Sequence, residues 1–235
     1  MKKVLGILGG MGPLASAEFL KTIYEFNAAD LEQKLPACIL YSDPTFPDRT
    51  KAIINQSEED LLIRFLVETL EKLIQLGASK IVISCITIHH FLPMLPTNLR
   101  ENIISLIDVI IQDILREKKQ YLLLCTNGTR QAGIFQKHPL WFLAEKYVRL
   151  PNEADQNAIH HLIYQLKKNG YQDAISFHLD NLIKKYPVDS LIAGCTEFHL
   201  LTKYFMTYKE QNDCIVDPLL SIAKNIKSLM NDDNI

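Results

Sequence analysis

The feature of this sequence that most restricts its fold is the regular alternation of short apolar runs with longer helical segments. Lys3–Leu8, Ala37–Ser42 and Lys80–Ser84 are short runs of mostly apolar residues, which are typical of buried strands. Segments with helical character separate them, and the alternation continues to the end of the chain. Because buried strands that alternate with helices form parallel sheets covered by helices, the sequence predicts an α/β fold.

The alternation divides into two halves of similar architecture. Later strands are predicted near Ile103–Leu106, Tyr121–Leu124, Tyr147–Leu150, Asp189–Gly194 and Cys214–Val216. A chain of 235 residues can hold two small domains, each with its own core. We expect residues 1–98 and 208–235 to form an N-terminal domain and residues 99–207 a C-terminal one. Each should contain a Rossmann-like parallel sheet, with the last strand and helix returning to the first domain.

The segment between the second and third predicted strands carries local signals for a loop and a helix. Asp43–Thr50 contains two prolines and three charged residues, so we expect a binding loop. Ser57-Glu-Glu-Asp60 resembles a capping box, with Asp in place of the usual Glu, and predicts a helix that begins at Ser57. Gly77 is expected to end that helix.

Composition excludes several classes of function. The net charge of −2 and the absence of a basic stripe argue against nucleic-acid binding. No apolar run reaches the roughly 18 residues that a membrane span requires. The apolar run at the N-terminus is too short for a signal peptide, and five cysteines is an odd count. We therefore expect a cytoplasmic protein with reduced cysteines.

Two predicted strands end in the same pattern, a small residue and then Cys-x-x-x-His. The first copy contains Cys85 and His89, and the second contains Cys195 and His199. A threonine follows shortly after each cysteine. Because ligands bind at the carboxyl ends of parallel strands, the two copies predict one site built between the two halves.

A pair of cysteines on opposite sides of a cleft suits one reaction in particular. A helix N-terminus just beyond each cysteine would lower the pKa of its thiol. A thiolate can then remove a proton from one face of a stereocentre while a thiol returns a proton to the other face. Cys38 lies within a predicted strand and Cys214 begins one, and we interpret both as core residues. Cys125 ends a strand in a small polar turn, and we interpret it as a core residue as well.

Four motifs in the same order resemble a known family. They are Gly9-Gly-Met-Gly-Pro13, Pro47-Asp-Arg-Thr50, Cys85-x-Thr-x-His89 and Gly194-Cys-Thr-Glu197. In combination they resemble the aspartate/glutamate racemase superfamily, and within it the aspartate racemases. The resemblance covers the whole chain and implies an amino-acid racemase that needs no cofactor and no metal. It also implies two similar α/β domains with the active site in the cleft between them, and a homodimer.

The resemblance also implies roles for individual residues. It makes Cys85 and Cys195 the acid/base pair and Arg49 a ligand of a substrate carboxylate, for which a planar guanidinium is well suited. Its further substrate-binding positions are Met11, Ile86, Thr87, Thr126, Thr129, Lys168, Thr196 and Glu197. The family usually has Asn where this chain has Ile86, so the preferred amino acid can differ from aspartate.

Five other interpretations remain open at this stage. The two cysteines with His89 and His199 have the residue types of a Cys₂His₂ zinc site. Gly10-Met-Gly12-Pro-Leu-Ala15 fits the dinucleotide fingerprint, although no acidic residue is clearly placed to follow it. Cys195 alone could be the nucleophile of a hydrolase. The remaining two are a non-catalytic amino-acid-binding module and a racemase of broad specificity.

Overall fold

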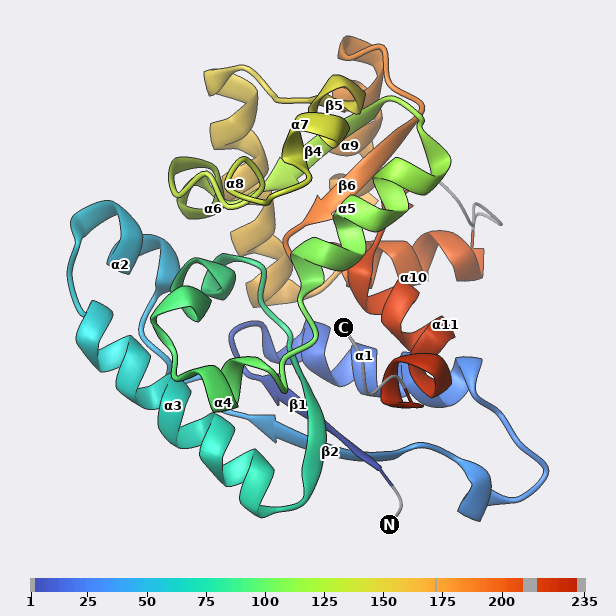
Figure 1. Cartoon of the computed structure of the whole chain (residues 1–235). Coiled ribbons are helices and arrows are strands. Elements are labelled where there is room, and N and C mark those ends of the chain that lie inside the picture. The colour runs from blue at the N-terminus through green and yellow to red at the C-terminus, as the bar shows by residue number, and fades with distance from the viewer. Residues whose placement is uncertain (1–2, 172, 209–214, 232–235) are drawn as a thin grey trace.

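Two parallel sheets form the centres of the two halves of the molecule (Figure 1). The computed structural model describes residues 3–171, 173–208 and 215–231. The first sheet contains β1 (Val4–Gly9), β2 (Ala37–Ser42) and β3 (Ala78–Ile83) in the order β2-β1-β3. The second contains β4 (Tyr121–Cys125), β5 (Val148–Arg149), β6 (Ser190–Gly194) and β7 (Ile215–Val216) in the order β5-β4-β6-β7. All of these pairings are parallel, which confirms the predicted α/β fold.

Helices surround both sheets (Figure 1). The first half contains α1 (Pro13–Phe26), η1 (Glu32–Lys34), α2 (Arg49–Asn55), α3 (Glu59–Gln75), η2 (Thr87–Met94) and α4 (Thr97–Arg100). They are followed by α5 (Leu106–Glu117), α6 (Asn127–Gln131), α7 (Trp141–Ala144), η3 (Glu145–Tyr147), α8 (Glu153–Asn169), α9 (Asp173–Lys185), α10 (Phe198–Tyr208) and α11 (Pro218–Asn231). None of the helices in the described part of the chain combines the length and apolarity needed to span a membrane.

The first three strands of each sheet have the same spatial order, which confirms the duplicated architecture. β1 lies between β2 and β3, and β4 lies between β5 and β6. The equivalent strands β3 and β6 are the two that lead into Cys85 and Cys195. The duplication therefore places the two cysteines at corresponding positions of the two halves.

Burial on both faces explains why β4 has a continuous apolar sequence. Leu122 and Leu124 pack into a core with residues of α8 and α9. Tyr121, Leu123 and Cys125 point the other way, into a core that also contains residues of α5 and α11. Alternate side chains of a strand face opposite sides of the sheet, so no polar face remains. Each fully buried leucine contributes about 1.5–3 kcal/mol to stability.

The predicted helix start at Ser57 is wrong, because the chain forms an additional helix just before it. Asp48 caps α2 by accepting a hydrogen bond from the backbone N–H of Lys51 at 2.9 Å. This helix ends at Gln56, which has a left-handed backbone with φ 50°, and the N–H of Ser57 bonds back to Ala52. Ser57 therefore belongs to the end of α2, and α3 begins at Glu59.

The strand predicted at Ile103–Leu106 is reduced to a single bridge. Ile103 pairs with Ile81 of β3, but the chain leaves the sheet at once. Ser105 accepts a hydrogen bond from the backbone N–H of Asp108 at 3.1 Å and acts as the N-cap of α5. Because α5 is capped at Ser105, the chain turns into the helix before a longer strand can form.

The last strand does not return to the first sheet, so this part of the predicted domain division is wrong. β7 pairs with β6, with Leu191 opposite Ile215, because Ile215 is buried in the core of the second half. Cys214, predicted to begin this strand, lies outside the described residues. α11 does pack against the first half, where Asn27, the C-cap residue of α1, donates a hydrogen bond to the carbonyl of Ala223 at 2.8 Å. The boundary near residue 98 stays a prediction.

Candidate active site

Direct contacts between the ends of β3 and β6 bring the two cysteine segments together. Thr196 Oγ1 donates a hydrogen bond to the carbonyl oxygen of Ser84 at 3.1 Å, and these residues adjoin Cys195 and Cys85. Both cysteines are buried, with exposed fractions of 6% for Cys85 and 4% for Cys195. Sequence positions far apart thus form one cluster at the junction of the two halves.

Cys195 is a protonated thiol in this arrangement. Its Sγ donates a hydrogen bond to Glu197 Oε2 at 2.7 Å. Burial and then the neighbouring Glu197 carboxylate raise the pKa of the Cys195 thiol well above its ordinary value, although Lys167 opposes them. The expectation that a helix N-terminus lowers this pKa is therefore wrong. Glu197, predicted as a substrate-binding residue, orients the Cys195 thiol through this hydrogen bond.

Arg49 is a buried cation with hydrogen-bonding capacity left over. Its exposed fraction is 8%, and its Nη atoms donate to the carbonyl oxygens of Pro47 at 2.9 Å and Met11 at 3.0 Å. Its Nε is buried and has no hydrogen-bond partner in the described structure. Burial lowers the pKa of Arg49, but Cys85 and Asp48 outweigh it, so the pKa is raised. An anion beside Cys85 would satisfy the unused donor.

Three threonines from both halves form a compact hydroxyl cluster. Thr87 Oγ1 lies 3.1 Å from Thr126 Oγ1 and 2.9 Å from Thr129 Oγ1, and all three side chains are buried. The Oγ1 atoms of Thr126 and Thr129 are 3.0 Å apart. The structure thus brings together three of the four predicted threonines, while Thr196 bonds to Ser84.

The lysine that lies beside the cysteine cluster is Lys167 and not the predicted Lys168. Lys167 Nζ lies 3.9 Å from Glu197 Oε1, whereas Lys168 is exposed to solvent. Burial lowers the pKa of Lys167, but Glu197, Cys195 and Cys85 outweigh it and raise the pKa. The buried stripe of α8 includes Ile163, which is four residues before Lys167, so helical periodicity favours Lys167 over Lys168.

A side-chain hydrogen bond that joins the two halves was not predicted from the sequence. Tyr164 donates a hydrogen bond from its hydroxyl to Asp48 Oδ2 at 2.8 Å. Tyr164 is one helical turn from Lys167, and Asp48 precedes Arg49. Sequence spacing gives no signal for this contact, because the two residues are in different halves of the chain.

Two other predicted residues do not present their side chains to a polar site. Ile86 is fully buried in the apolar core, and Met11 contributes its carbonyl oxygen to Arg49 while its side chain is buried. Cys125 is a core residue, as predicted, and burial raises its pKa to about 12. Cys38 is partly buried, and burial raises its pKa to about 11.

The histidines of the two motifs are structural. His89 Nδ1 lies 3.0 Å from the carbonyl oxygen of Cys85, and its Nε2 accepts a hydrogen bond from the backbone N–H of Leu106 at 3.0 Å. His199 Nδ1 lies 2.7 Å from Asp217 Oδ2, and its Nε2 lies 3.0 Å from Thr22 Oγ1. With all four ring nitrogens occupied, neither histidine supports the zinc site or acts as a base for Cys195.

The glycine turn after β1 also differs from a dinucleotide site. A Cβ atom added to Gly12 would collide with Glu197 Oε1, so a carboxylate fills the space that the turn leaves. A negative charge at this position would repel a pyrophosphate. Gly12 is needed because Glu197 approaches its backbone closely. The geometry of this turn therefore gives no support to the nicotinamide interpretation.

Acid should destabilise the protein through His89. Burial lowers the pKa of His89 to about 4, whereas an imidazole in an unfolded chain titrates near 6.5. The unfolded chain binds the proton more readily, so the stability contributed by neutral His89 is complete above about pH 6.5 and is lost as the pH falls toward 4. We expect about 3 kcal/mol to be lost from this group. Urea unfolding between pH 7 and pH 4 measures it.

The matched control for this prediction is His89→Asn, which removes the titrating group and retains a short polar side chain. The parent should lose more free energy of unfolding than the variant over the same pH interval. Equal losses in both proteins would show that His89 does not contribute to the acid sensitivity.

The two parallel sheets flanked by helices define an α/β protein with two similar halves. Aspartate racemase from Picrophilus torridus has this fold with a TM-score of 0.80 and 23% identity, and the alignment covers 97% of this chain and 94% of that one. Glutamate racemase from Campylobacter jejuni subsp. jejuni gives a TM-score of 0.64 and 19% identity, with coverage of 96% and 85%. These likenesses show the fold.

Sequence comparison defines the family. The broad specificity amino-acid racemase RacX of Bacillus subtilis (strain 168) is 22% identical over 233 residues, which cover 96% of this chain and 97% of that protein. The family model described as Asp/Glu/Hydantoin racemase matches residues 8–219. The chain therefore belongs to the Asp/Glu/hydantoin racemase family.

Proposed function

We propose that the protein is a cofactor-independent amino-acid racemase in which Cys85 and Cys195 act on opposite faces of the α-carbon. The observation that carries this proposal is the placement of two buried thiols at the ends of the equivalent strands β3 and β6. A thiol and a thiolate differ by one proton, so the pair needs no other group to take and return it.

The hydrogen bond of Cys195 indicates how one direction of the reaction begins. Cys195 holds its proton and therefore starts as the acid. Cys85, as a thiolate, takes the α-proton, and the electron pair of that C–H bond stays on carbon. Cys195 then delivers its proton to the opposite face, which forms the new C–H bond. The site is left with the protonation states exchanged, as the reverse reaction requires.

The charges around the thiols favour an acidic amino acid. Arg49 and Lys167 are two cations near Cys85 and Cys195, and the Glu197 carboxylate interacts with both cations. The unpartnered Nε of Arg49 supports binding of a substrate carboxylate. The hydroxyl cluster of Thr87, Thr126 and Thr129 supplies donors for the second carboxylate.

A racemase of broad specificity is the second candidate, and Ile86 is the observation that favours it. Its side chain is apolar and packs into the core, so this position contributes no hydrogen-bonding side chain to a substrate. A site with fewer polar groups loses fewer hydrogen bonds when an amino acid with a neutral side chain binds, so it discriminates less strongly against such a substrate. The relative from B. subtilis bears the name of a broad specificity enzyme, which is consistent with this candidate.

Incubation with single enantiomers in D₂O tests the proposal. L-aspartate should give D-aspartate that carries deuterium at the α-carbon, as read by chiral chromatography and mass spectrometry. Alanine racemised at a similar rate would favour the broad-specificity candidate. If no amino acid is inverted or deuterated, the racemase proposal fails and a binding module becomes the better interpretation.

A further inference from the structure

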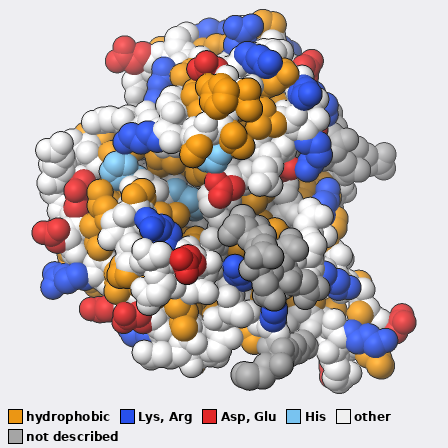
Figure 2. Space-filling view, in the orientation of Figure 1, with side chains coloured by type: hydrophobic (Ala, Val, Ile, Leu, Met, Phe, Trp, Pro, Cys, Tyr) orange, Lys and Arg blue, Asp and Glu red, His pale blue; other side chains and the backbone are white. Residues whose placement is uncertain are grey.

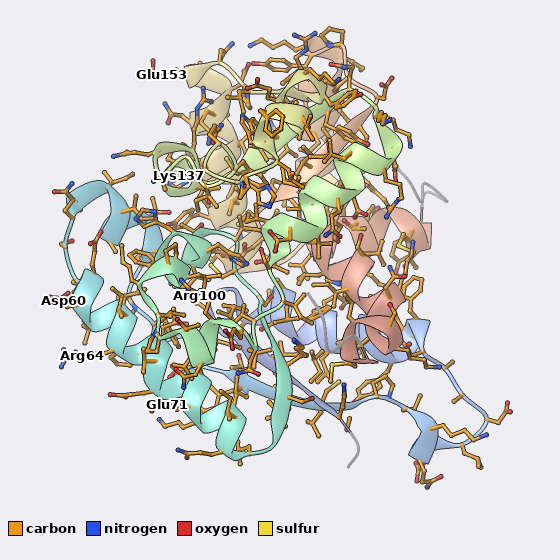
Figure 3. The ribbon with its side chains drawn as sticks, viewed as in Figure 1. Asp60, Arg64, Glu71, Arg100, Lys137 and Glu153 are labelled. Carbon is orange, nitrogen blue, oxygen red and sulfur yellow. The ribbon has the colours of Figure 1, made fainter. Side chains whose placement is uncertain are left out.

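A cavity of about 550 Å³ lies beside the site and is formed by segments of both halves. Its walls come from the end of η2, from the connection between α4 and α5, and from residues 134–139 after α6. Arg100 and Lys137, labelled in Figure 3, belong to segments on either side of it. Figure 2 shows histidine side chains among hydrophobic ones on this face of the molecule.

The cavity combines an apolar interior with cationic groups. Leu92, Ile103 and Ile107 contribute apolar surface from three consecutive segments of the chain. Arg100 and Lys137 have no ion-pair partner among the residues that the structure describes; Arg100 makes a hydrogen bond of 3.4 Å to Thr97 Oγ1. Both cations are thus available to an anion.

The one carboxylate that lines the cavity, Asp108, is hydrogen-bonded to His138. His138 Nδ1 accepts a hydrogen bond from the backbone N–H of Leu140 at 3.1 Å, so its proton is on Nε2. That Nε2 donates to Asp108 Oδ1 at 2.8 Å. Asp108 keeps its negative charge in this hydrogen bond, and together with Arg100 and Lys137 it leaves the lining with a net charge of +1.

We propose that this cavity is a second ligand site, for a small organic carboxylate with an aromatic or branched apolar body. Its volume falls within the range of small-molecule sites, about 300–1,000 Å³. The apolar walls would bury the body of the ligand, and Arg100 and Lys137 would bind its carboxylate. The proposal does not depend on the racemase chemistry of the neighbouring site.

The cavity is connected to the cysteine site through hydrogen bonds. His89 lines the cavity and also holds the carbonyl of Cys85 and the N–H of Leu106. On the other wall, the N–H of Ile134 bonds to the carbonyl of Thr129 at 3.4 Å. A ligand here therefore touches segments that position Cys85 and Thr129, and should slow amide exchange in η2 and in residues 134–138.

Three probes of similar shape but different charge test the proposal. Indole-3-acetate should bind the full-length protein, as measured by isothermal titration calorimetry. Neutral indole-3-acetamide and cationic tryptamine should each bind at least about tenfold more weakly, because they lack the carboxylate. Equal affinity for all three probes would overturn the proposed anion preference.

Two charge-removing variants locate the site. Lys137→Met and Arg100→Met should each weaken indole-3-acetate binding by about tenfold while the stem of the side chain is retained. Arg64→Met is the matched control, since Arg64 is an exposed cation of α3 that lies outside the cavity lining (Figure 3). Unchanged binding in the two cavity variants, or amide protection confined to residues 49–55 and 195–199, would overturn the proposal.

Discussion

Replacing either Cys85 or Cys195 by serine should reduce racemisation by roughly 100- to 10,000-fold, the contribution typical of general acid–base catalysis. Serine retains the approximate size of cysteine, but its hydroxyl is far less acidic and cannot replace a thiolate. Because inversion requires proton transfer on both faces, the loss should be similar in both variants. Polarimetry with each enantiomer of aspartate measures the rates.

Deuterium exchange distinguishes two bases from one. Exchange at the α-carbon without inversion needs chiefly one base, so each serine variant should retain some exchange with one enantiomer only. The two variants should prefer opposite enantiomers. NMR of each aspartate enantiomer in D₂O records this mirror relation, which neither a single-nucleophile hydrolase nor a binding module predicts.

Cys38→Ser is the matched control for both experiments, because Cys38 lies in β2 and is only partly buried. This variant should racemise aspartate at nearly the parent rate. Survival of near-parent racemisation in Cys85→Ser or Cys195→Ser would contradict the two-thiol mechanism.

Arg49→Lys should lower kcat/KM for aspartate by roughly 30- to 100-fold, which corresponds to about 2–3 kcal/mol. Lysine keeps the positive charge but loses the planar fork that reaches the carbonyls of Met11 and Pro47. Those acceptors would then compete with the substrate for a single ammonium group. Steady-state kinetics give kcat/KM, and urea unfolding separates a binding defect from a folding defect.

Arg64→Lys is the appropriate comparison, since it makes the same change at an exposed position of α3. It should leave kcat/KM within the error of the parent. If the kinetics of Arg49→Lys match the parent on aspartate and glutamate, the placement of the carboxylate site at Arg49 is wrong.

Several features of this protein follow from local sequence alone. Apolar runs such as Leu122–Leu124 form strands wherever they are buried on both faces, so their class and approximate limits are predictable. The repeated pattern around Cys85 and Cys195 indicated that two strand ends share a site. Parallel strands have their carboxyl ends at the same edge of the sheet, so this inference depends on the strand topology and not on the side-chain packing.

Tertiary structure decided the features that depend on partners distant in the sequence. Ser57 has the local pattern of an N-cap, but its N–H is hydrogen-bonded to Ala52 of α2. Ile215 pairs with β6 because its side chain packs into the core of the second half. Lys167 and Lys168 are equivalent as residue types, and only the packing of α8 turns Lys167 toward Glu197.

The protonation of Cys195 is the clearest case of this dependence. A helix N-terminus favours the thiolate, whereas burial and a nearby carboxylate favour the thiol. The sequence by itself does not decide which of these effects on the pKa is larger. Which of them dominates depends on the depth of the sulfur and on its 2.7 Å hydrogen bond to Glu197. The hydrogen bond joins residues only two positions apart, whereas the burial of the sulfur is set only when the surrounding strands and helices pack around it.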